Sequence, residues 1–332
     1  MRNIKHLIRS ISMMSIAITV LMVSASPVQA GPYLLVNGNF TVVKIDLTTG
    51  QSSLYGLFAD QNTQLRNVIV APDGDVFVSM NGGNKNIAQL VESPGLSYRV
   101  PVDFTTSPSG LGPAEMAFYN GNLWAATDSG RSVNEYDGQT GQLIQQIKPS
   151  GTGNIRGMTI DGNNLYFAEI FQDRISKFDL TTSPPSGGIF INSPSNPDEP
   201  YELHIGHDGN LFVSSRYQTT IDEFDINTGA FIRTFVDLND FNPTATNNDT
   251  GNYFTYSPEL NCYFADFDGG TIYQFGTDGK LIATFTSPLL FNDARGMVVV
   301  VPEAGTITLV ASVAGVFLLV AITRRGQRRS EV

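Results

Sequence analysis

The feature that most constrains the fold of this chain is a sequence pattern that recurs every 42 to 51 residues. Each copy is a short apolar segment that ends on a large apolar residue, and in most copies an Asp and a turn containing Gly follow, as in Val133 to Gly141. The residues that end the segments are Ile45, Leu90, Tyr136, Phe178, Phe224 and Phe275. Such a period indicates similar structural units that stack on one another.

A second pattern lies within most of these units and consists of two apolar segments joined by Asp-Gly or Asn-Gly. The joining residues are Asp73-Gly74, Asn120-Gly121, Asp161-Gly162 and Asp208-Gly209. These dipeptides are typical of tight β-hairpins. Each unit therefore holds about four short strands. A four-stranded sheet exposes two apolar faces, and neighbouring sheets cover those faces in a β-propeller, so the repeat predicts that fold.

The two ends of the repeat region together predict how the ring closes. Residues 276–301 and 31–45 supply about one further repeat, and Arg295-Gly296-Met297 matches Arg156-Gly157-Met158. We therefore predict an all-β, six-bladed β-propeller over residues 31–301, in which the last strand, 295–300, completes the blade that begins at Tyr33. Closure of this kind leaves no unpaired strand edge at the junction.

Residues 1–30 have the layout of a secretory signal peptide. Basic residues near the start precede an apolar run from Ile11 to Val23, and small residues around Ala30 are spaced as at a cleavage site. The alternative is an uncleaved N-terminal anchor. The apolar run is shorter than the roughly 17 to 25 residues that span a bilayer, which favours the signal peptide.

The C-terminal segment, 302–332, predicts a single transmembrane helix. An uncharged apolar stretch from Thr306 to Thr323 is followed at once by Arg324 and Arg325, with two further arginines close behind. A cationic flank of this kind keeps that end in the cytoplasm. A buried core helix is the alternative, but it would not need four arginines directly after it.

The order of Val301-Pro302-Glu303, an apolar span and terminal arginines resembles the PEP-CTERM sorting tail of exported bacterial proteins, with Ala304 where the family usually has a second proline. The resemblance covers about 30 residues. It implies recognition by a membrane transpeptidase called exosortase, and placement on the cell surface or in an extracellular polysaccharide matrix.

The strand and turn residues also resemble those of NHL-repeat and gluconolactonase-like six-bladed propellers, for example in Asp208 to Val213. This resemblance implies the fold. Gluconolactonase-like enzymes use a metal in the central funnel, where it polarises a carbonyl group and activates water. Their metal ligands do not match this sequence motif by motif, so no catalytic residue is transferred.

Alignment of the repeats predicts which side chains face the central funnel. The first ring holds Arg66, Ala114, Arg156, Tyr201, Asn252 and Arg295, and the next positions hold Asn67, Glu115, Gly157, Glu202, Tyr253 and Gly296. The exits of the second strands hold Asn37, Asn81, Asp128, Glu169, Arg216 and Asp266.

Three interpretations of this funnel stay open. Arginines can bind carboxylate or sulfate groups of a polar ligand, and the candidates are Arg66, Arg156, Arg216 and Arg295. Carboxylates can instead hold a divalent cation such as Ca²⁺, and the candidates are Glu115, Asp128, Glu169, Glu202 and Asp266. The third interpretation is a solvated channel in which arginines and acids neutralise one another.

The net charge of the chain indicates which classes of partner it can bind. The whole chain has a formal net charge of −11, but residues 31–301 carry 13 Lys and Arg against 29 Asp and Glu, which is −16. An acidic body of this kind argues against nucleic acid and favours cations or cationic surfaces. The single Cys262 excludes an intramolecular disulfide.

The sequence has no strong catalytic motif. Residues 31–301 contain two histidines, His204 and His207, and two segments, 183–200 and 237–251, look like long polar loops. The sequence therefore predicts an exported, surface-anchored propeller that acts as a binding or scaffold module in the bacterial envelope or matrix, with polysaccharide or an envelope protein as partner. The alternative is a metal-dependent, gluconolactonase-like hydrolase with its site in the funnel.

Overall fold

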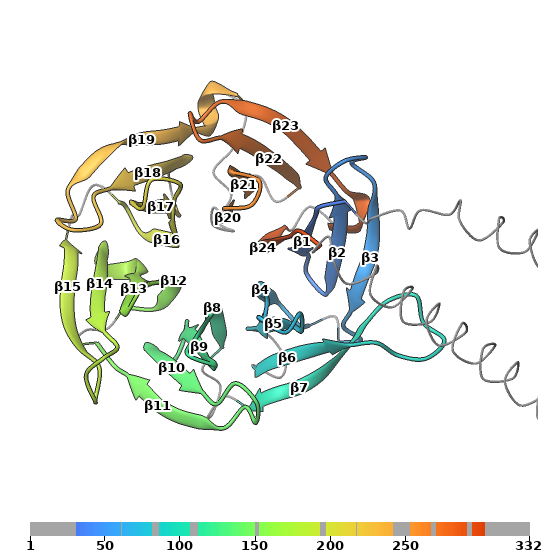
Figure 1. Ribbon diagram of the computed structural model, residues 1–332, viewed down its shortest axis with the longest axis horizontal. Coiled ribbons are helices and arrows are strands. Elements are labelled where there is room, and N and C mark those ends of the chain that lie inside the picture. Colours follow the sequence, from blue (N-terminus) through green and yellow to red (C-terminus); the bar gives the residue numbers. More distant parts are fainter. Residues whose placement is uncertain are drawn as a thin grey trace, which may run out of the picture. The chain divides into compact units, whose positions relative to one another are not determined.

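The computed structural model describes residues 31–302, except 61, 82–85, 107–111, 150–152, 193–196, 217, 242–252, 267–269 and 291–293. These residues form six four-stranded antiparallel sheets around a central axis (Figure 1). We call the sheets blades and number them from the one that contains β1. The prediction of an all-β, propeller-like fold is confirmed.

Each blade is given from its innermost to its outermost strand. Blade 1 consists of β24 (Arg295–Val300), β1 (Tyr33–Asn37), β2 (Thr41–Asp46) and β3 (Ser52–Leu57). Blade 2 consists of β4 (Leu65–Val70), β5 (Val76–Met80), β6 (Asn86–Val91) and β7 (Val100–Thr106). Blade 3 consists of β8 (Pro113–Tyr119), β9 (Asn122–Thr127), β10 (Ser132–Tyr136) and β11 (Leu143–Ile147).

The other three blades have the same order of strands. Blade 4 consists of β12 (Ile155–Asp161), β13 (Asn164–Glu169), β14 (Arg174–Asp179) and β15 (Ser186–Asn192). Blade 5 consists of β16 (Pro200–Ile205), β17 (Leu211–Ser215), β18 (Thr220–Phe224) and β19 (Phe231–Asp237). Blade 6 consists of β20 (Tyr253–Ser257), β21 (Cys262–Asp266), β22 (Thr271–Gly276) and β23 (Leu281–Thr286). Short 3₁₀ turns are η2 (Ile170–Gln172), η3 (Leu238–Asp240) and η4 (Pro288–Leu290).

The recurring Asp of the sequence pattern shapes the turn between the third and fourth strands. In blade 3, Asp137 Oδ1 accepts hydrogen bonds from Thr140 N at 2.7 Å and from Gln139 N at 3.1 Å. Asp225 makes the same contacts in blade 5. The hydroxyls of Thr140 and Thr228 also donate to these carboxylates, and together with the backbone bonds they hold the pKa of both carboxyls below its usual range. Local turn chemistry, rather than a ligand, therefore accounts for these repeated acids.

Ring closure joins segments from the two ends of the described chain. β24 pairs antiparallel with β1, with Leu34 opposite Val299 and Val36 opposite Met297. Blade 1 is thus built from the last strand and the first three strands, and the inner edge of β1 is covered by β24.

Six apolar clusters fill the spaces between neighbouring blades. The cluster between blades 2 and 3, for example, joins Phe77 and Ile87 to Met116 and Leu123. The cluster between blades 6 and 1 joins Phe264 to Leu34. Each blade therefore buries both of its faces against neighbouring blades. The same apolar packing joins blade 6 to blade 1, where the ring closes. Cys262 is buried in this last cluster.

One segment differs from its sequence interpretation. The stretch 183–200 looked like a polar loop, but Ser186–Asn192 forms β15, the outermost strand of blade 4. Gly187 and Gly188 hid the strand, because glycine weakens strand propensity. A Cβ on Gly187 would lie 2.0 Å from Lys177 O, so the close approach of β14 requires glycine there. In the other stretch, 237–251, η3 follows β19, and residues 242–251 lie outside the described residues.

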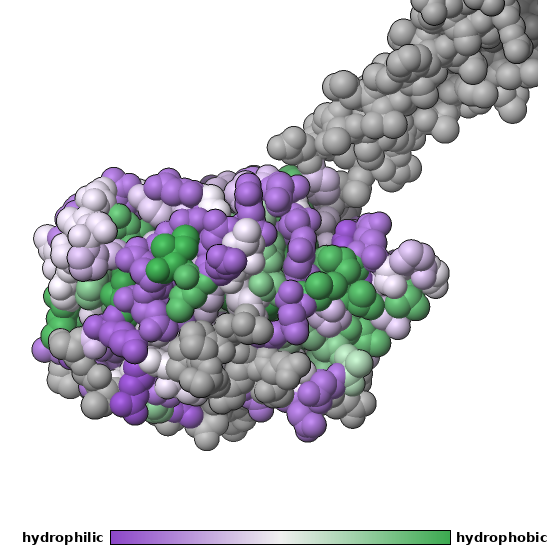
Figure 2. All heavy atoms as spheres, turned by 90° about the horizontal axis from the view of Figure 1, so that it is seen from below, coloured by the Kyte–Doolittle hydropathy of each residue, from purple (hydrophilic) through white to green (hydrophobic). Residues whose placement is uncertain are grey.

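The outer surface mixes polar and apolar side chains (Figure 2). The exposed apolar residues on the outermost strands are Val102, Leu143, Ile144, Ile189, Phe231, Ile232, Leu281 and Ile282. Within the part of the chain that the structure describes, no helix is long and apolar enough to cross a membrane. The predicted signal peptide, 1–30, and the predicted transmembrane helix, 306–323, lie outside that part.

We predict that Phe264→Ala weakens the closing junction. Phe264 is fully buried between blades 6 and 1, so its truncation should lower the free energy of unfolding by about 3 to 5 kcal/mol. Urea denaturation measures this change. Phe231→Ala is the control, because Phe231 is 48% exposed on β19 and should cost much less. Equal losses in the two variants would contradict the importance of the junction.

Candidate functional site

The inner strands carry a repeated irregularity that brings polar side chains to the funnel. In β4, Leu65 pairs with Met80 and Val68 with Val78, so two residues of β4 lie opposite one residue of β5. The same β-bulge occurs in β8, β12 and β16. The bulged pairs are Arg66-Asn67, Ala114-Glu115, Arg156-Gly157 and Tyr201-Glu202. Bulges redirect side chains and often border functional sites.

In blades 2 and 5, serine side chains form hydrogen bonds with backbone groups at the bulges. Ser79 Oγ accepts a hydrogen bond from Asn67 N at 3.0 Å and donates one to Ala114 O at 2.5 Å, which joins blade 2 to blade 3. Ser214 Oγ accepts a hydrogen bond from Glu202 N at 3.2 Å. The second strands thus contribute polar groups that hold the bulges in place.

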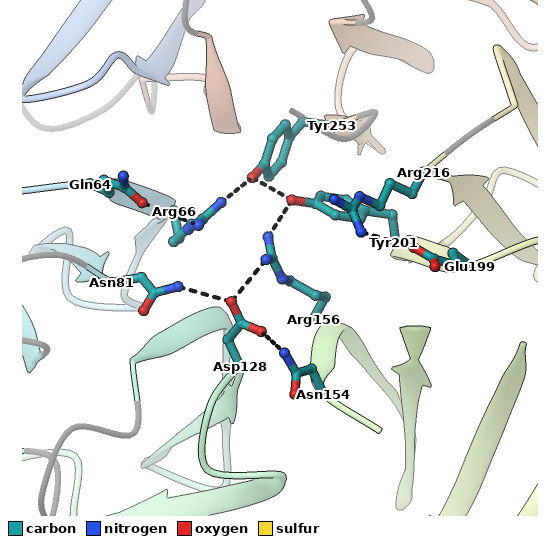
Figure 3. A network of polar contacts seen from close by, with 10 residues as sticks. All are labelled: Gln64, Arg66, Asn81, Asp128, Asn154, Arg156, Glu199, Tyr201, Arg216 and Tyr253. Carbon is teal, nitrogen blue, oxygen red and sulfur yellow. Dashed lines mark hydrogen bonds and ion pairs between the residues drawn. The ribbon is translucent and has the colours of Figure 1, made fainter. Parts of the chain in front are cut away.

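A polar network spans the centre of the ring (Figure 3). Arg156 forms an ion pair with Asp128 at 2.8 Å and donates a hydrogen bond to Tyr201 Oη. The hydroxyls of Tyr201 and Tyr253 lie 3.1 Å apart, and Arg66 Nη1 donates to Tyr253 Oη at 3.4 Å. One continuous chain of contacts therefore joins side chains from blades 2, 3, 4, 5 and 6.

The positive charges in this network are unevenly balanced. Asp128 faces Arg156 and also accepts hydrogen bonds from Asn81 and Asn154. Arg66, in contrast, donates to Tyr253 and Gln64, which are uncharged. Its buried Nε finds no hydrogen-bond acceptor among the described residues. Arg66 is therefore the cation of the network that is best suited to an anionic group from outside.

A small cavity lies at the centre of this arrangement. Its volume is about 10 Å³, which is roughly enough for one water molecule. The lining residues are Arg66, Ala114, Glu115, Arg156, Tyr201, Glu202 and Tyr253.

Two buried carboxyl groups meet beside the cavity. Glu115 of β8 and Glu202 of β16 are hydrogen-bonded to each other, and Glu115 also accepts a hydrogen bond from Asn67 Nδ2 at 2.7 Å. The strand between them, β12, has Gly157 at the equivalent position. A Cβ on Gly157 would lie 2.4 Å from Tyr201 O and 2.9 Å from Glu202 Cα. Glycine there permits the close approach of β12 and β16 and leaves room for the carboxyl pair.

Burial favours the uncharged forms of this pair. It raises the pKa of Glu202 to about 7, although the hydrogen bond from Glu115 and the charge of Arg156 oppose the rise. Burial also raises the pKa of Glu115 well above its ordinary value, and the nearby charge of Glu202 adds to the effect. The protonated form of Glu115 is thus favoured, and its O–H donates the hydrogen bond to Glu202. Burial lowers the pKa of His204, so this nearby imidazole is uncharged at neutral pH.

The other residues that the sequence suggested do not line this cavity. Glu169 is fully buried and binds Arg174 and Ser176 within blade 4. Arg216 forms an ion pair with Glu199 at 3.1 Å. Asp266 and Arg295 are buried at the ends of β21 and β24.

The candidate metal ligands are accordingly dispersed. Glu115 and Glu202 meet, but Asp128 is engaged with Arg156, and Glu169 is engaged with Arg174. Across residues 31–302, gaps excepted, no three His, Cys, Asp or Glu side chains form a group that could hold a metal ion.

The predicted rings need one correction in blade 6. Alignment placed Tyr253 in the second ring and Asn252 in the first, but Tyr253 lies with Tyr201 and the arginines at the cavity. The reason is that β20 pairs with β21 without a bulge, so its register is one residue out of step with β16. The pairing of Tyr201 with Tyr253 is therefore not evident from the sequence, because an alignment by repeat period does not reveal a missing bulge.

Comparison by sequence finds no matching protein family and no matching curated protein. By structure, the chain is similar to virginiamycin B lyase from Staphylococcus aureus, with a TM-score of 0.51 and 16% identity over 69% of this chain and 72% of that protein. It is similar to a protein of unknown function from Bacteroides caccae, with a TM-score of 0.62 and 12% identity over 82% of this chain and 100% of that one.

A third similar structure is a proposed 6-phosphogluconolactonase from Bacteroides fragilis, with a TM-score of 0.55 and 17% identity over 80% of this chain and 84% of that protein. At these identities the comparisons establish the propeller fold and transfer no residue role.

We predict that Glu202→Gln changes how stability depends on pH. The folded protein holds the Glu202 proton up to about pH 7, whereas the unfolded chain releases it near the ordinary value of 4.5. Protonated Glu202 therefore stabilises the folded state fully below about pH 4.5. This stabilisation is lost as the pH rises to about 7. Between pH 5 and 8, the variant should lose about 2 to 3 kcal/mol less free energy of unfolding than wild type.

Urea denaturation at several pH values measures this difference. His204 and the other titrating groups are present in both proteins, so the comparison isolates the effect of residue 202. Glu92→Gln alters a carboxylate that is 84% exposed and serves as the control. Parallel stability curves for wild type and Glu202→Gln would contradict the assignment.

Proposed function

We propose that this protein is an exported, surface-anchored binding module, and that its funnel binds a ligand with an anionic group and several hydroxyls. The observation that carries the proposal is the convergence of Arg66, Arg156, Tyr201 and Tyr253 on one cavity. Paired arginines form strong, charge-assisted hydrogen bonds to carboxylate or sulfate. Two tyrosine hydroxyls beside them can donate to or accept from a hydroxylated ligand.

The charge distribution supports an anion rather than a cation at this position. Burial favours the uncharged form of Glu115, Asp128 already neutralises Arg156, and Arg66 has uncharged partners. A carboxylate from a ligand would supply the missing counter-charge. The cavity of about 10 Å³ has room for about one water molecule, so the charged group would lie at its mouth while the rest of the ligand lies in the funnel.

Arg66→Gln tests this assignment. We expect wild type to bind glucuronate, gluconate or sulfate in equilibrium titrations, and we expect the variant to lose at least about tenfold in affinity, as when one charge-assisted hydrogen bond is removed. Arg233→Gln is the control, because Arg233 faces Glu223 on the outer side of blade 5. Unchanged affinity in Arg66→Gln, or no binding of any of these anions by wild type, would contradict the proposal.

We propose further that the chain is directed to the bacterial envelope or extracellular matrix. The support is the signal-like segment 1–30, the apolar span 306–323 with terminal arginines, and the resemblance of the tail to PEP-CTERM substrates of exosortase. A polysaccharide or an envelope protein would then be the natural partner, and the acidic body argues against nucleic acid.

Cell fractionation with mass spectrometry of the mature ends tests this address. We expect the protein in the envelope or medium with an N-terminus at or near Gly31. A full-length cytosolic protein with residues 1–30 intact would overturn the proposal.

The alternative function is a metal-dependent hydrolase of the gluconolactonase type, and one observation favours it. Two carboxyl groups, Glu115 and Glu202, lie together beside the cavity, and a divalent cation such as Ca²⁺ can take the place of a proton between two carboxylates. This alternative predicts a stoichiometric ion that EDTA removes and that Glu115→Gln fails to retain. Elemental analysis of the purified protein, together with unfolding curves with and without EDTA, distinguishes the two functions.

A further inference from the structure

A second candidate site lies on the outer rim, where a connection from blade 2 reaches blade 1. The segment between β6 and β7, residues 92–99, ends alongside β3 (Figure 1). Arg99 N donates to Tyr55 O at 2.8 Å, and Leu57 N donates to Arg99 O at 3.1 Å. These bonds extend the edge of blade 1 by one residue and fix the segment against its neighbour.

The fixed segment and blade 1 enclose an open groove of about 440 Å³, which is within the range of roughly 300 to 1,000 Å³ for ligand sites. Its polar lining includes Lys44, Ser53, Tyr55, Ser93, Tyr98 and Arg99. It shares no lining residue with the funnel cavity.

Two cations in this groove are held against aromatic rings. The guanidinium of Arg99 lies 4.4 Å from the ring centre of Tyr55, and the ammonium of Lys44 lies 4.0 Å from that of Tyr33. Such stacking orients a cation while leaving its N–H groups available to a ligand. Burial raises the pKa of Tyr55 to about 12, so its hydroxyl keeps its proton at neutral pH.

The counter-charge of Arg99 is weakly held. Glu92 contacts Arg99 at 3.3 Å, and its side chain is 84% exposed. Exposed pairs of this kind contribute little to stability, so a carboxylate from a ligand can replace Glu92 at small cost. Lys44 and Arg99 thus place two positive charges in one groove of a propeller whose residues 31–301 carry a net charge of −16.

We propose that this groove binds a segment of an acidic oligosaccharide of the uronate type. The two cations match its carboxylates, and the serine and tyrosine hydroxyls match its hydroxyl groups. The groove is open to solvent, which suits a chain that continues beyond it. A peptide that adds as a strand fits less well, because Arg99 already occupies the edge of β3 at Tyr55 and Leu57.

Titration calorimetry with galacturonate hexamer tests the proposal. Wild type should bind the hexamer with an affinity that falls as salt is raised, and Lys44→Ala should weaken binding at least about tenfold. Glu92→Gln should strengthen binding, because it removes the competing carboxylate. That gain cannot arise from misfolding. Lys177→Ala is the matched control, because Lys177 also lies over a tyrosine, Tyr166, in blade 4 but outside the groove.

Three further outcomes would overturn the proposal. They are an absence of hexamer binding by wild type, equal affinity for free galacturonate and the hexamer, and equal affinity for poly-glutamate. Arg66→Gln separates this site from the funnel. Hexamer binding that survives in Arg66→Gln and fails in Lys44→Ala assigns the binding to the rim, whereas the reverse result assigns it to the funnel and refutes the groove.

Discussion

The packing of apolar blade faces against one another is the interaction on which the rest of the structure depends. A four-stranded sheet of this sequence has two apolar faces, and a stack of such sheets would leave one face bare at each end. The ring removes both ends, because the cluster around Phe264 and Leu34 joins blade 6 to blade 1. The pairing of β24 with β1 secures that junction through the backbone as well. Every position that faces the funnel is set by this closed arrangement.

The funnel shows how a regular scaffold produces an irregular site. Four inner strands share the same bulge, yet the residues at the bulge differ, so the ring presents arginine, glutamate, glycine and tyrosine at related positions. Gly157 is as important as the charged residues, because its missing side chain lets Glu115 and Glu202 meet. Burial then favours the uncharged forms of this pair, and the arginines contribute positive charge to the cavity.

The propeller has two polar sites that differ in their exposure to water. The funnel network is enclosed by inner strands, and its ion pair between Arg156 and Asp128 is mostly shielded from water. The rim groove is open, and its ion pair between Arg99 and Glu92 is exposed. The first arrangement suits a single charged group held in a fixed geometry, and the second suits a polymer that binds through several weak contacts.

Much of the fold could be predicted from the sequence, because hairpin turns and strand periodicity are local properties of the chain. The spacing of Ile45 to Phe275 indicated the repeated sheets, and the likeness of Arg295-Gly296-Met297 to Arg156-Gly157-Met158 indicated an inner strand after β23. The strand β15 escaped notice because its two glycines have low strand propensity, although the close approach of β14 requires glycine at position 187.

The site was only partly predictable. Arg66, Arg156, Glu115 and Glu202 were identified as funnel residues, but the partner of each depended on bulges and on register. A β-bulge shifts a side chain by one position and does not change the sequence period. Because β20 has no bulge, the position of Tyr253 could not be predicted from the period. The sequence alone thus determined the repeat, the hairpins and the charge of the body. Only the tertiary structure decided which polar groups meet, because those contacts join residues up to 187 positions apart.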